Sequence, residues 1–269
     1  MPTYKIGGKT CEYPEGATYR EIADAFQAEY PERIALVRLN GKIRELMHQV
    51  EGDGELELLT LRDRAGHKAY VRTAIMLLIK AVRDELGIKD RTVLKVEFTI
   101  GSGYYCTLQG GIKLGGNLLK NVEDRMQREI EAGTKIEKKS FPIERAIDLF
   151  RRQGMSDKVS LFRYRRSSSI NVYRMGDYCD YYYGYMLPDV SYLTAISLMP
   201  YKGGFLLVLP NRSEPEELPN FDERDNLYEQ LKLNTHWGEM MGIETVGDLN
   251  DLIVRGETEQ IILVQEALQ

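Results

Sequence analysis

The amino-acid sequence predicts an α+β fold, in which a small β-rich unit is followed by a larger mixed unit. Two hairpin dipeptides, Gly7-Gly8 and Asn40-Gly41, fall within the first 60 residues, and such pairs supply the positive φ angles that tight turns need. Residues 70–86 carry an apolar stripe at helical spacing, and residues 94–100 alternate between apolar and polar side chains as a half-buried strand does. With 269 residues, of which 43% are hydrophobic, the chain is long enough to bury a core.

Residues 1–62 are expected to form a ubiquitin-like β-grasp domain. Two short strands flank the Gly7-Gly8 turn, and Thr18 with Glu21 makes a capping box at the start of a helix. Three more strands follow, two of them joined by the Asn40-Gly41 turn. The expected strands span residues 3–6, 10–13, 34–39, 43–47 and 55–59.

Residues 65–212 are expected to form a larger α+β domain, which begins after a polar break at residues 63–68. Its helices alternate with strands, and Gly87 and Gly133 end the first two helices because glycine accepts the left-handed conformation of a helix terminus. The expected helices span residues 70–86, 117–132 and 142–153, and the expected strands span residues 94–100, 104–108, 134–139, 170–175, 178–183, 193–198 and 204–209.

Residues 213–269 are expected to be a linker and a helical segment. Residues 211–220 hold two prolines among polar and acidic positions, which is typical of a linker. Helical patterns follow at 222–241 and 246–254, and 261–264 is expected to be a short apolar strand. A tail of this size is too small for a core of its own, so we expect it to pack on a neighbouring element.

Charge and cysteine usage exclude several classes of protein. The net charge of −5 argues against non-specific wrapping of nucleic acid, although a local basic groove is compatible with it. Cys11, Cys106 and Cys179 are too few and too widely spaced for a disulfide framework, so reduced thiols and a cytoplasmic location are expected. No signal peptide is apparent, and no apolar run approaches the ~20 residues of a membrane span.

Motifs for phosphate binding, metal binding and nucleophilic catalysis are incomplete in this sequence. Residues 110–117 have the glycine spacing of a phosphate loop without its lysine and hydroxyl, and Gly8-Lys9-Thr10 lacks the first glycine, so both are interpreted as turns. His48, His67 and His236 have no partner at helical spacing. We therefore expect no metal, no catalytic residue and no ATP site within this chain.

Tyrosines and arginines are concentrated in one region. Nine of the 17 tyrosines fall between Tyr164 and Tyr201, and Arg163, Arg165, Arg166 and Arg174 lie among them. Such a mixture can stack bases and hold phosphates. Tyrosine is also favoured in sheets, so half of the cluster is more simply explained as the inward face of a sheet.

Two degenerate motifs connect these segments to a known family. The chain resembles the N-terminal half of threonyl-tRNA synthetase, with residues 1–62 similar to its TGS domain and 65–212 similar to its editing domain, which alanyl-tRNA synthetases share. The family helix with two histidines four residues apart falls on Arg72 and Met76. The family loop, Asp followed by Cys-Arg-Gly-Pro-His and Pro, reads here Asp180-Tyr181-Tyr182-Tyr183-Gly184-Tyr185-Met186-Leu187-Pro188. Tyr182 replaces the cysteine and Met186 the histidine, so the resemblance implies an editing domain that has lost its reactive residues.

A second resemblance concerns the tail. Residues 237–250 and 261–268 look like the bridge that, in one bacterial group, joins these two domains to a uridine kinase-like domain. The resemblance implies that residues 213–269 lead toward such a nucleoside kinase, an ATP-dependent transferase that would be a partner domain in the same polypeptide. ATP and Mg²⁺ are expected only in that domain, and this chain would be its non-catalytic regulatory or RNA-binding region.

The first hypothesis for the degenerate site is a ligand pocket between the helix at 71–82 and the loop at 178–188. Arg72 would contact a phosphate or carboxylate of a tRNA or nucleotide, and Tyr182 or Tyr185 would stack on it. The candidate pocket consists of Arg72, Met76, Asp180, Tyr182, Tyr185 and Met186.

Two alternatives stay open at this point. The chain could be a free-standing aminoacyl-tRNA trans-editing hydrolase that uses a Cys179 or Cys106 thiolate, although the neighbouring Asp180 is expected to raise the pKa of Cys179. Alternatively, Arg72 packs at a domain boundary while Met76 and Met186 fill the former cavity.

Overall fold

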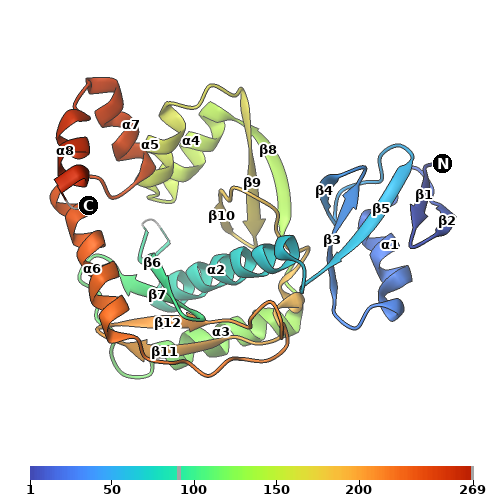
Figure 1. The fold of residues 1–269 in the computed structure, drawn as a ribbon, viewed down its shortest axis with the longest axis horizontal. Coiled ribbons are helices and arrows are strands. Elements are labelled where there is room, and N and C mark those ends of the chain that lie inside the picture. Colours follow the sequence, from blue (N-terminus) through green and yellow to red (C-terminus); the bar gives the residue numbers. More distant parts are fainter. Residues whose placement is uncertain (90–91, 268–269) are drawn as a thin grey trace.

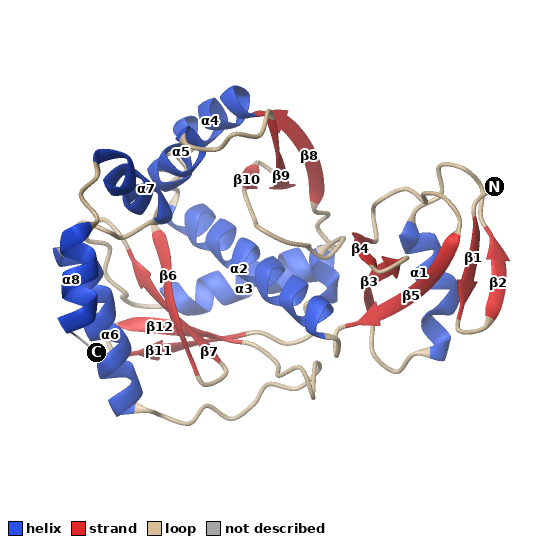
Figure 2. Cartoon of the chain, turned by 45° about the horizontal axis from the view of Figure 1, so that its top comes forward, coloured by secondary structure: helices blue, strands red, loops and turns tan. Residues whose placement is uncertain are grey.

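A computed structural model of the chain describes residues 1–89 and 92–267 and confirms the α+β class. The N-terminal unit lies at one end of the molecule and joins the larger part through a single continuous segment (Figure 1). Figure 2 shows the strands of the larger part in separate groups, with helices between and around them.

The N-terminal unit is a five-stranded sheet in the order β2-β1-β5-β3-β4, covered by α1. Asn40 and Gly41 have φ angles of 48° and 81°, so the expected hairpin turn is present. The backbone N–H of Thr18 donates to Glu21 Oε1 at 3.0 Å, which caps α1. The elements are β1 (Thr3–Ile6), β2 (Lys9–Glu12), α1 (Tyr19–Phe26), β3 (Ile34–Leu39), β4 (Lys42–Glu45) and β5 (Gly54–Thr60).

The expected polar break at residues 63–68 is wrong, because these residues form the first turns of α2 (Arg64–Leu86). Asp63 is the N-cap, and its Oδ2 accepts the backbone N–H of Thr60 at 2.7 Å, which fixes the helix start against the end of β5. A Cβ on Gly66 would lie 2.0 Å from the Thr60 carbonyl oxygen, so only glycine permits this close approach. The helix ends at Gly87, whose φ is 64°, as expected.

Helix α2 runs through the middle of the larger part, between two sheets (Figures 1 and 2). A four-stranded sheet in the order β11-β12-β7-β6 lies on one side with α3, and a three-stranded sheet in the order β10-β9-β8 lies on the other with α4 and α5. The elements are β6 (Leu94–Ile100), β7 (Gly103–Leu108), α3 (Leu118–Ala132), β8 (Glu137–Pro142), α4 (Ile143–Arg152), α5 (Ser156–Arg163), β9 (Ser169–Met175), β10 (Tyr178–Asp180), β11 (Ser197–Tyr201) and β12 (Gly204–Val208).

Several expected boundaries in this part are wrong. The strand expected at 134–139 begins three residues later, and the one expected at 178–183 ends at Asp180. The strand expected at 193–198 is mostly loop after a short 3₁₀ turn (Val190–Tyr192), and pairing resumes only at Ser197. Helix α5 follows Gly154 and has no counterpart among the expected elements.

The tail packs on the larger part, as expected for a segment too small to form a core. Its elements are α6 (Asp225–Met240), α7 (Val246–Arg255) and α8 (Glu259–Ala267), so the strand expected at 261–264 is wrong. A short apolar run carries no periodicity that separates a strand from a helix. Tyr228 of α6 packs edge-on against Tyr105, at 5.3 Å between ring centroids. Within residues 1–89 and 92–267, no helix combines the length and apolarity that crossing a membrane requires.

Candidate functional site

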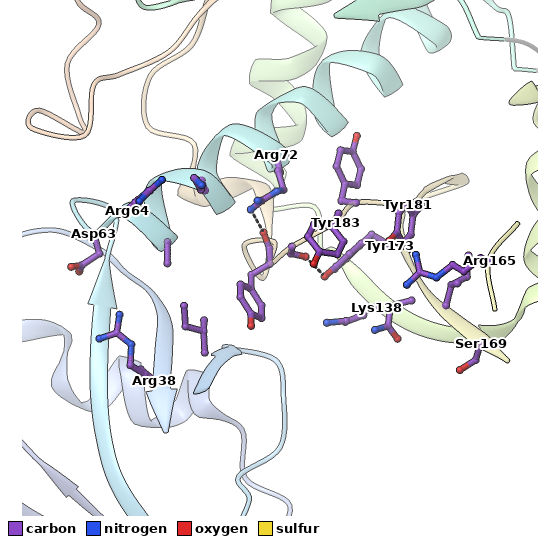
Figure 3. A pocket seen from close by; sticks show the side chains of 18 residues that line it. Arg38, Asp63, Arg64, Arg72, Lys138, Arg165, Ser169, Tyr173, Tyr181 and Tyr183 are labelled. Atoms are coloured by element: carbon purple, nitrogen blue, oxygen red, sulfur yellow. Dashed lines mark hydrogen bonds between the residues drawn. The ribbon is translucent and has the colours of Figure 1, made fainter. Parts of the chain in front are cut away.

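A cavity of about 880 Å³, here called the basic groove, lies where the N-terminal unit, α2 and the segment after β10 meet (Figure 3). Its volume falls in the range of ~300–1,000 Å³ that small-molecule sites occupy. The lining side chains are mainly cationic or aromatic. They are Arg38, Ile43, Asp63, Arg64, Ala65, Lys68, Arg72, Lys138, Arg165, Ser169, Ile170, Asn171, Tyr173, Tyr181, Tyr182, Tyr183, Gly184 and Tyr185.

Six lysines and arginines line the groove, against a single acidic residue, Asp63. Arg64, Lys68 and Arg72 follow at intervals of four residues and so share one face of α2. Arg64 and Lys68 are exposed, and among the described residues neither has an ion-pair partner. Because the positive end of the helix dipole lies at the same place, the electrostatic field in the groove favours anions.

Tyrosines form much of the opposite wall of the groove. Tyr183 is 86% exposed, so its ring is available to a ligand. The Arg165 guanidinium lies 5.4 Å from the centre of the Tyr181 ring and donates to Tyr181 Oη at 2.6 Å. That ring packs edge-on against Phe162 at 4.9 Å. The groove therefore offers one fixed and one solvent-facing aromatic ring beside its cations.

The loop from Gly184 to Leu187 has no strand partner and is held by side chains instead. The Gly184 carbonyl lies 2.8 Å from Tyr173 Oη, and the Tyr185 carbonyl accepts from Arg72 Nη1 at 3.3 Å (Figure 3). The Met186 N–H donates to Glu45 Oε1 at 2.9 Å, and the Leu187 N–H donates to Thr73 Oγ1 at 3.1 Å. Four successive backbone groups are thus bonded by side chains from β9, α2 and β4.

Arg72 lies directly against Gly184. Gly184 has a φ of 136°, which requires glycine, and a Cβ there would lie 2.5 Å from Arg72 Cζ and displace the guanidinium. This contact and the bond to Tyr185 fix the guanidinium at the groove wall. A charged guanidinium keeps its protons and cannot act as a base or as a metal ligand.

The six residues of the predicted pocket separate into two sets of three. Arg72, Tyr182 and Tyr185 line the groove. Met76, Met186 and Asp180 do not, and they are 0%, 2% and 4% exposed. Both methionines belong to the hydrophobic core, as in the interpretation that they fill the former cavity.

Asp180 serves as a buried structural carboxylate. Its Oδ2 accepts from Tyr178 Oη at 2.9 Å, its Oδ1 accepts the Tyr181 N–H at 2.7 Å, and Lys158 Nζ lies 3.7 Å away. Burial raises the pKa of Asp180, and the Lys158 charge opposes this shift. Tyr182 Oη is buried without a hydrogen-bond partner, and burial raises the pKa of Tyr182 well above its ordinary value.

The groove contains no cysteine and no metal site among the described residues. Burial raises the pKa of Cys106 to about 12. It also raises the pKa of Cys179, where Asp177 and Asp180 add to the effect and Arg174 opposes it. Neither thiol lines the groove. In residues 1–89 and 92–267, no three His, Cys, Asp or Glu side chains come close enough together to hold a metal ion.

Sequence reasoning missed several residues of this site. Arg64 and Lys68 fall in the expected polar break, although their four-residue spacing before Arg72 is a usable signal of a helical face. Tyr173 was noted only as part of the tyrosine cluster. Glu45 comes from the N-terminal unit, 141 residues before Met186, and no local pattern announces that contact.

Most of the chain is similar to part of the threonine–tRNA ligases. It is 28% identical to the enzyme of Acetivibrio thermocellus over 200 residues, which is 74% of this chain and 31% of the relative. It is 27% identical to threonine–tRNA ligase 2 of Bacillus subtilis over 199 residues, again 74% and 31%. The Clostridium kluyveri enzyme is 25% identical over 229 residues, 84% of this chain and 36% of the relative. The chain spans about a third of the length of these curated relatives, and no protein-family model matches it.

Proposed function

We propose that this region of the protein binds the single-stranded 3′ end of a tRNA in the basic groove and does not hydrolyse it. The observation that carries the proposal is the lining of the groove, in which six cationic side chains lie beside tyrosine rings and no cysteine or metal site is present among the described residues. An RNA end supplies what this lining is suited to hold, since it combines phosphates with unstacked bases.

Similarity favours tRNA over other RNA, because the relatives are named as ligases of threonine and tRNA. The positions that correspond to the reactive residues of the resembled editing domain support binding without chemistry. Met76 and Met186 are in the core, and Arg72 is fixed by Tyr185 and Gly184. A bound RNA end would therefore meet an anion-binding wall where a hydrolase needs an activated water.

Binding of tRNA with a fluorophore near its 3′ end, measured by anisotropy at several salt concentrations, tests the proposal. We expect saturable binding. The logarithm of the association constant should fall linearly with the logarithm of the salt concentration, because counterions are released when RNA binds. The double variant Arg64→Gln/Lys68→Gln should bind more weakly and reduce the salt slope by about 2, at ~1 per lost phosphate contact.

A matched control is Lys113→Gln/Lys120→Gln, which removes the same charge from exposed lysines outside the groove. We expect it to leave the salt slope close to that of the wild type. Absence of tRNA binding at low salt would overturn the proposal. Equal effects of the two double variants would show that the net charge, and not the groove, attracts the RNA.

The uridine kinase-like parent is a separate proposal, which rests only on the resemblance of residues 237–250 and 261–268. We propose on this basis that the region regulates a nucleoside kinase-like partner domain that binds ATP and Mg²⁺. The coding sequence downstream of residue 269 tests it. A glycine-rich loop that ends in Gly-Lys-Ser/Thr would support the proposal, and a synthetase-like or absent continuation would overturn it.

A further inference from the structure

Glu45, the last residue of β4, reaches from the N-terminal unit to the back of the groove wall. Its side chain is only 12% exposed and accepts three hydrogen bonds. Oε1 lies 2.6 Å from Tyr173 Oη and 2.9 Å from Met186 N, and Oε2 lies 2.8 Å from Lys138 Nζ. One carboxylate thus connects β4 to β8, to β9 and to the loop that follows β10.

Tyr173 extends this connection to Gly184. The Tyr173 hydroxyl lies between Glu45 Oε1 and the Gly184 carbonyl, at 2.6 and 2.8 Å, so two acceptors share its one proton. Burial, and then the charge of Glu45, raises the pKa of Tyr173, so the hydroxyl stays protonated as a donor. Glu45 therefore bonds Met186 directly and holds the Tyr173 hydroxyl beside the Gly184 carbonyl, so it contacts the chain on either side of Tyr185.

The negative charge of Glu45 separates a positioning role from an attractive one. A carboxylate directly behind a cation-lined groove opposes the binding of any anionic ligand, so Glu45 does not contribute attraction. One of its three bonds, from the Met186 N–H, instead restrains a loop that has no strand partner, and the other two join β4 to β8 and β9 beside that loop. The same loop carries Tyr185 and Gly184 of the groove wall and, through Gly184, is in contact with Arg72.

We propose that Glu45 is a positioning residue for the RNA site, by which the docked N-terminal unit sets the shape of the groove. The inference rests on the proposed function, because its first test measures affinity for tRNA. It goes beyond that function because the N-terminal unit and the larger part would form the site together. The N-terminal unit controls binding through one side chain, in addition to lining the groove with Arg38 and Ile43.

The test compares Glu45→Ala with Glu45→Gln in the full chain. Charge alone predicts that both variants bind tRNA more tightly than the wild type, because each removes a negative charge. Positioning predicts that Glu45→Ala binds about tenfold or more weakly, since several bonds to a charged acceptor are lost. The amide oxygen of Gln still accepts from Met186, so this variant should stay within about threefold of the wild type, despite the lost ion pair with Lys138.

Glu57→Ala is the matched control. Glu57 is exposed, lies on β5 and pairs with Arg38, so the variant removes a carboxylate near the groove without touching the loop. We expect its tRNA affinity to equal or exceed that of the wild type. If Glu45→Ala fails to fold, Tyr173→Phe removes the same connection to Gly184 at constant shape and should also weaken binding.

Amide hydrogen exchange of Met186 provides a readout that does not depend on RNA. We expect exchange to accelerate by about tenfold or more in Glu45→Ala and to stay slow in Glu45→Gln. Unchanged Met186 exchange, or tighter tRNA binding by Glu45→Ala, would overturn the inference. If the wild type binds no tRNA, the proposed function fails, whereas the exchange result still decides whether Glu45 positions the loop.

Discussion

Replacing Met76 by alanine tests whether the position of a former reactive residue is now part of the core. Met76 is 0% exposed in the middle of α2, between the two sheets. The substitution removes three heavy atoms from this environment, where burial of a methionine side chain contributes ~1.5–3 kcal/mol. The cavity that remains adds to this loss, so we expect the free energy of unfolding to fall by about 3 kcal/mol, within the ~2–5 kcal/mol typical of such truncations.

Thermal unfolding followed by circular dichroism measures this change. At ~2–4 °C per kcal/mol for a chain of this size, the melting temperature should drop by about 6–12 °C. Met240→Ala is the matched control, since Met240 is also helical but is 57% exposed. It should change stability by no more than ~0.5 kcal/mol. Equal, small effects of the two variants would refute the reasoning, because they would mean that Met76 faces an open site.

Three further predictions concern the loop, the buried hydroxyls and a thiol. Gly184→Ala should destabilise the fold by ~1–3 kcal/mol in urea titration, because it forces a left-handed φ and a clash with Arg72; an unchanged midpoint would contradict the contact. Tyr178→Phe should cost about 1–3 kcal/mol, since it removes a donor from a buried carboxylate, whereas Tyr182→Phe should cost less, because the Tyr182 hydroxyl lies near Asp180 without a direct hydrogen bond; a reversed order would contradict this bonding. Cys106, whose pKa burial raises from 9.0 to about 12, should resist iodoacetamide at pH 8 until the chain is unfolded. Since the pKa of Cys106 is higher in the folded state, its contribution to stability is present below pH 9 and is lost as pH rises from 9 toward 12. The melting temperature should therefore fall less steeply with pH in Cys106→Ala than in the wild type over that range. Equal slopes in the two proteins would contradict this burial.

Helix ends marked by glycine could be predicted from the sequence because they depend on a local requirement. Gly87 and Gly133 end α2 and α3 where expected, with φ angles of 64° and 61°. The start of α2 could not be placed by composition, because polar residues at 63–68 suit an exposed helix face as well as a turn. The Asp63 bond to Thr60 and the packing of Gly66 on Thr60 place the helix start. The start of strand β11 was placed four residues too early and helix α8 was expected to be a strand, since tertiary contacts override short, ambiguous patterns.

Some residues of the site could be predicted from local motifs, and others depend on contacts between distant segments. Arg72, Tyr182 and Tyr185 come from a helix and a loop that the resemblance already paired, and all three line the groove. Glu45 reaches the loop by a contact between units, which no periodicity encodes. The burial of Met76 and Met186 was also undecided by sequence, because methionine suits both a pocket wall and a core.

An RNA end that is bound in the groove without chemistry is left intact. The most direct measurement is the lifetime of the ester bond in aminoacyl-tRNA, at a chain concentration that saturates binding in the anisotropy assay. We expect the ester to decay at the rate seen in the same buffer without protein. A shorter lifetime, which returns to the protein-free value in Cys179→Ala, would contradict binding without chemistry. It would show that the chain is a hydrolase with an altered site.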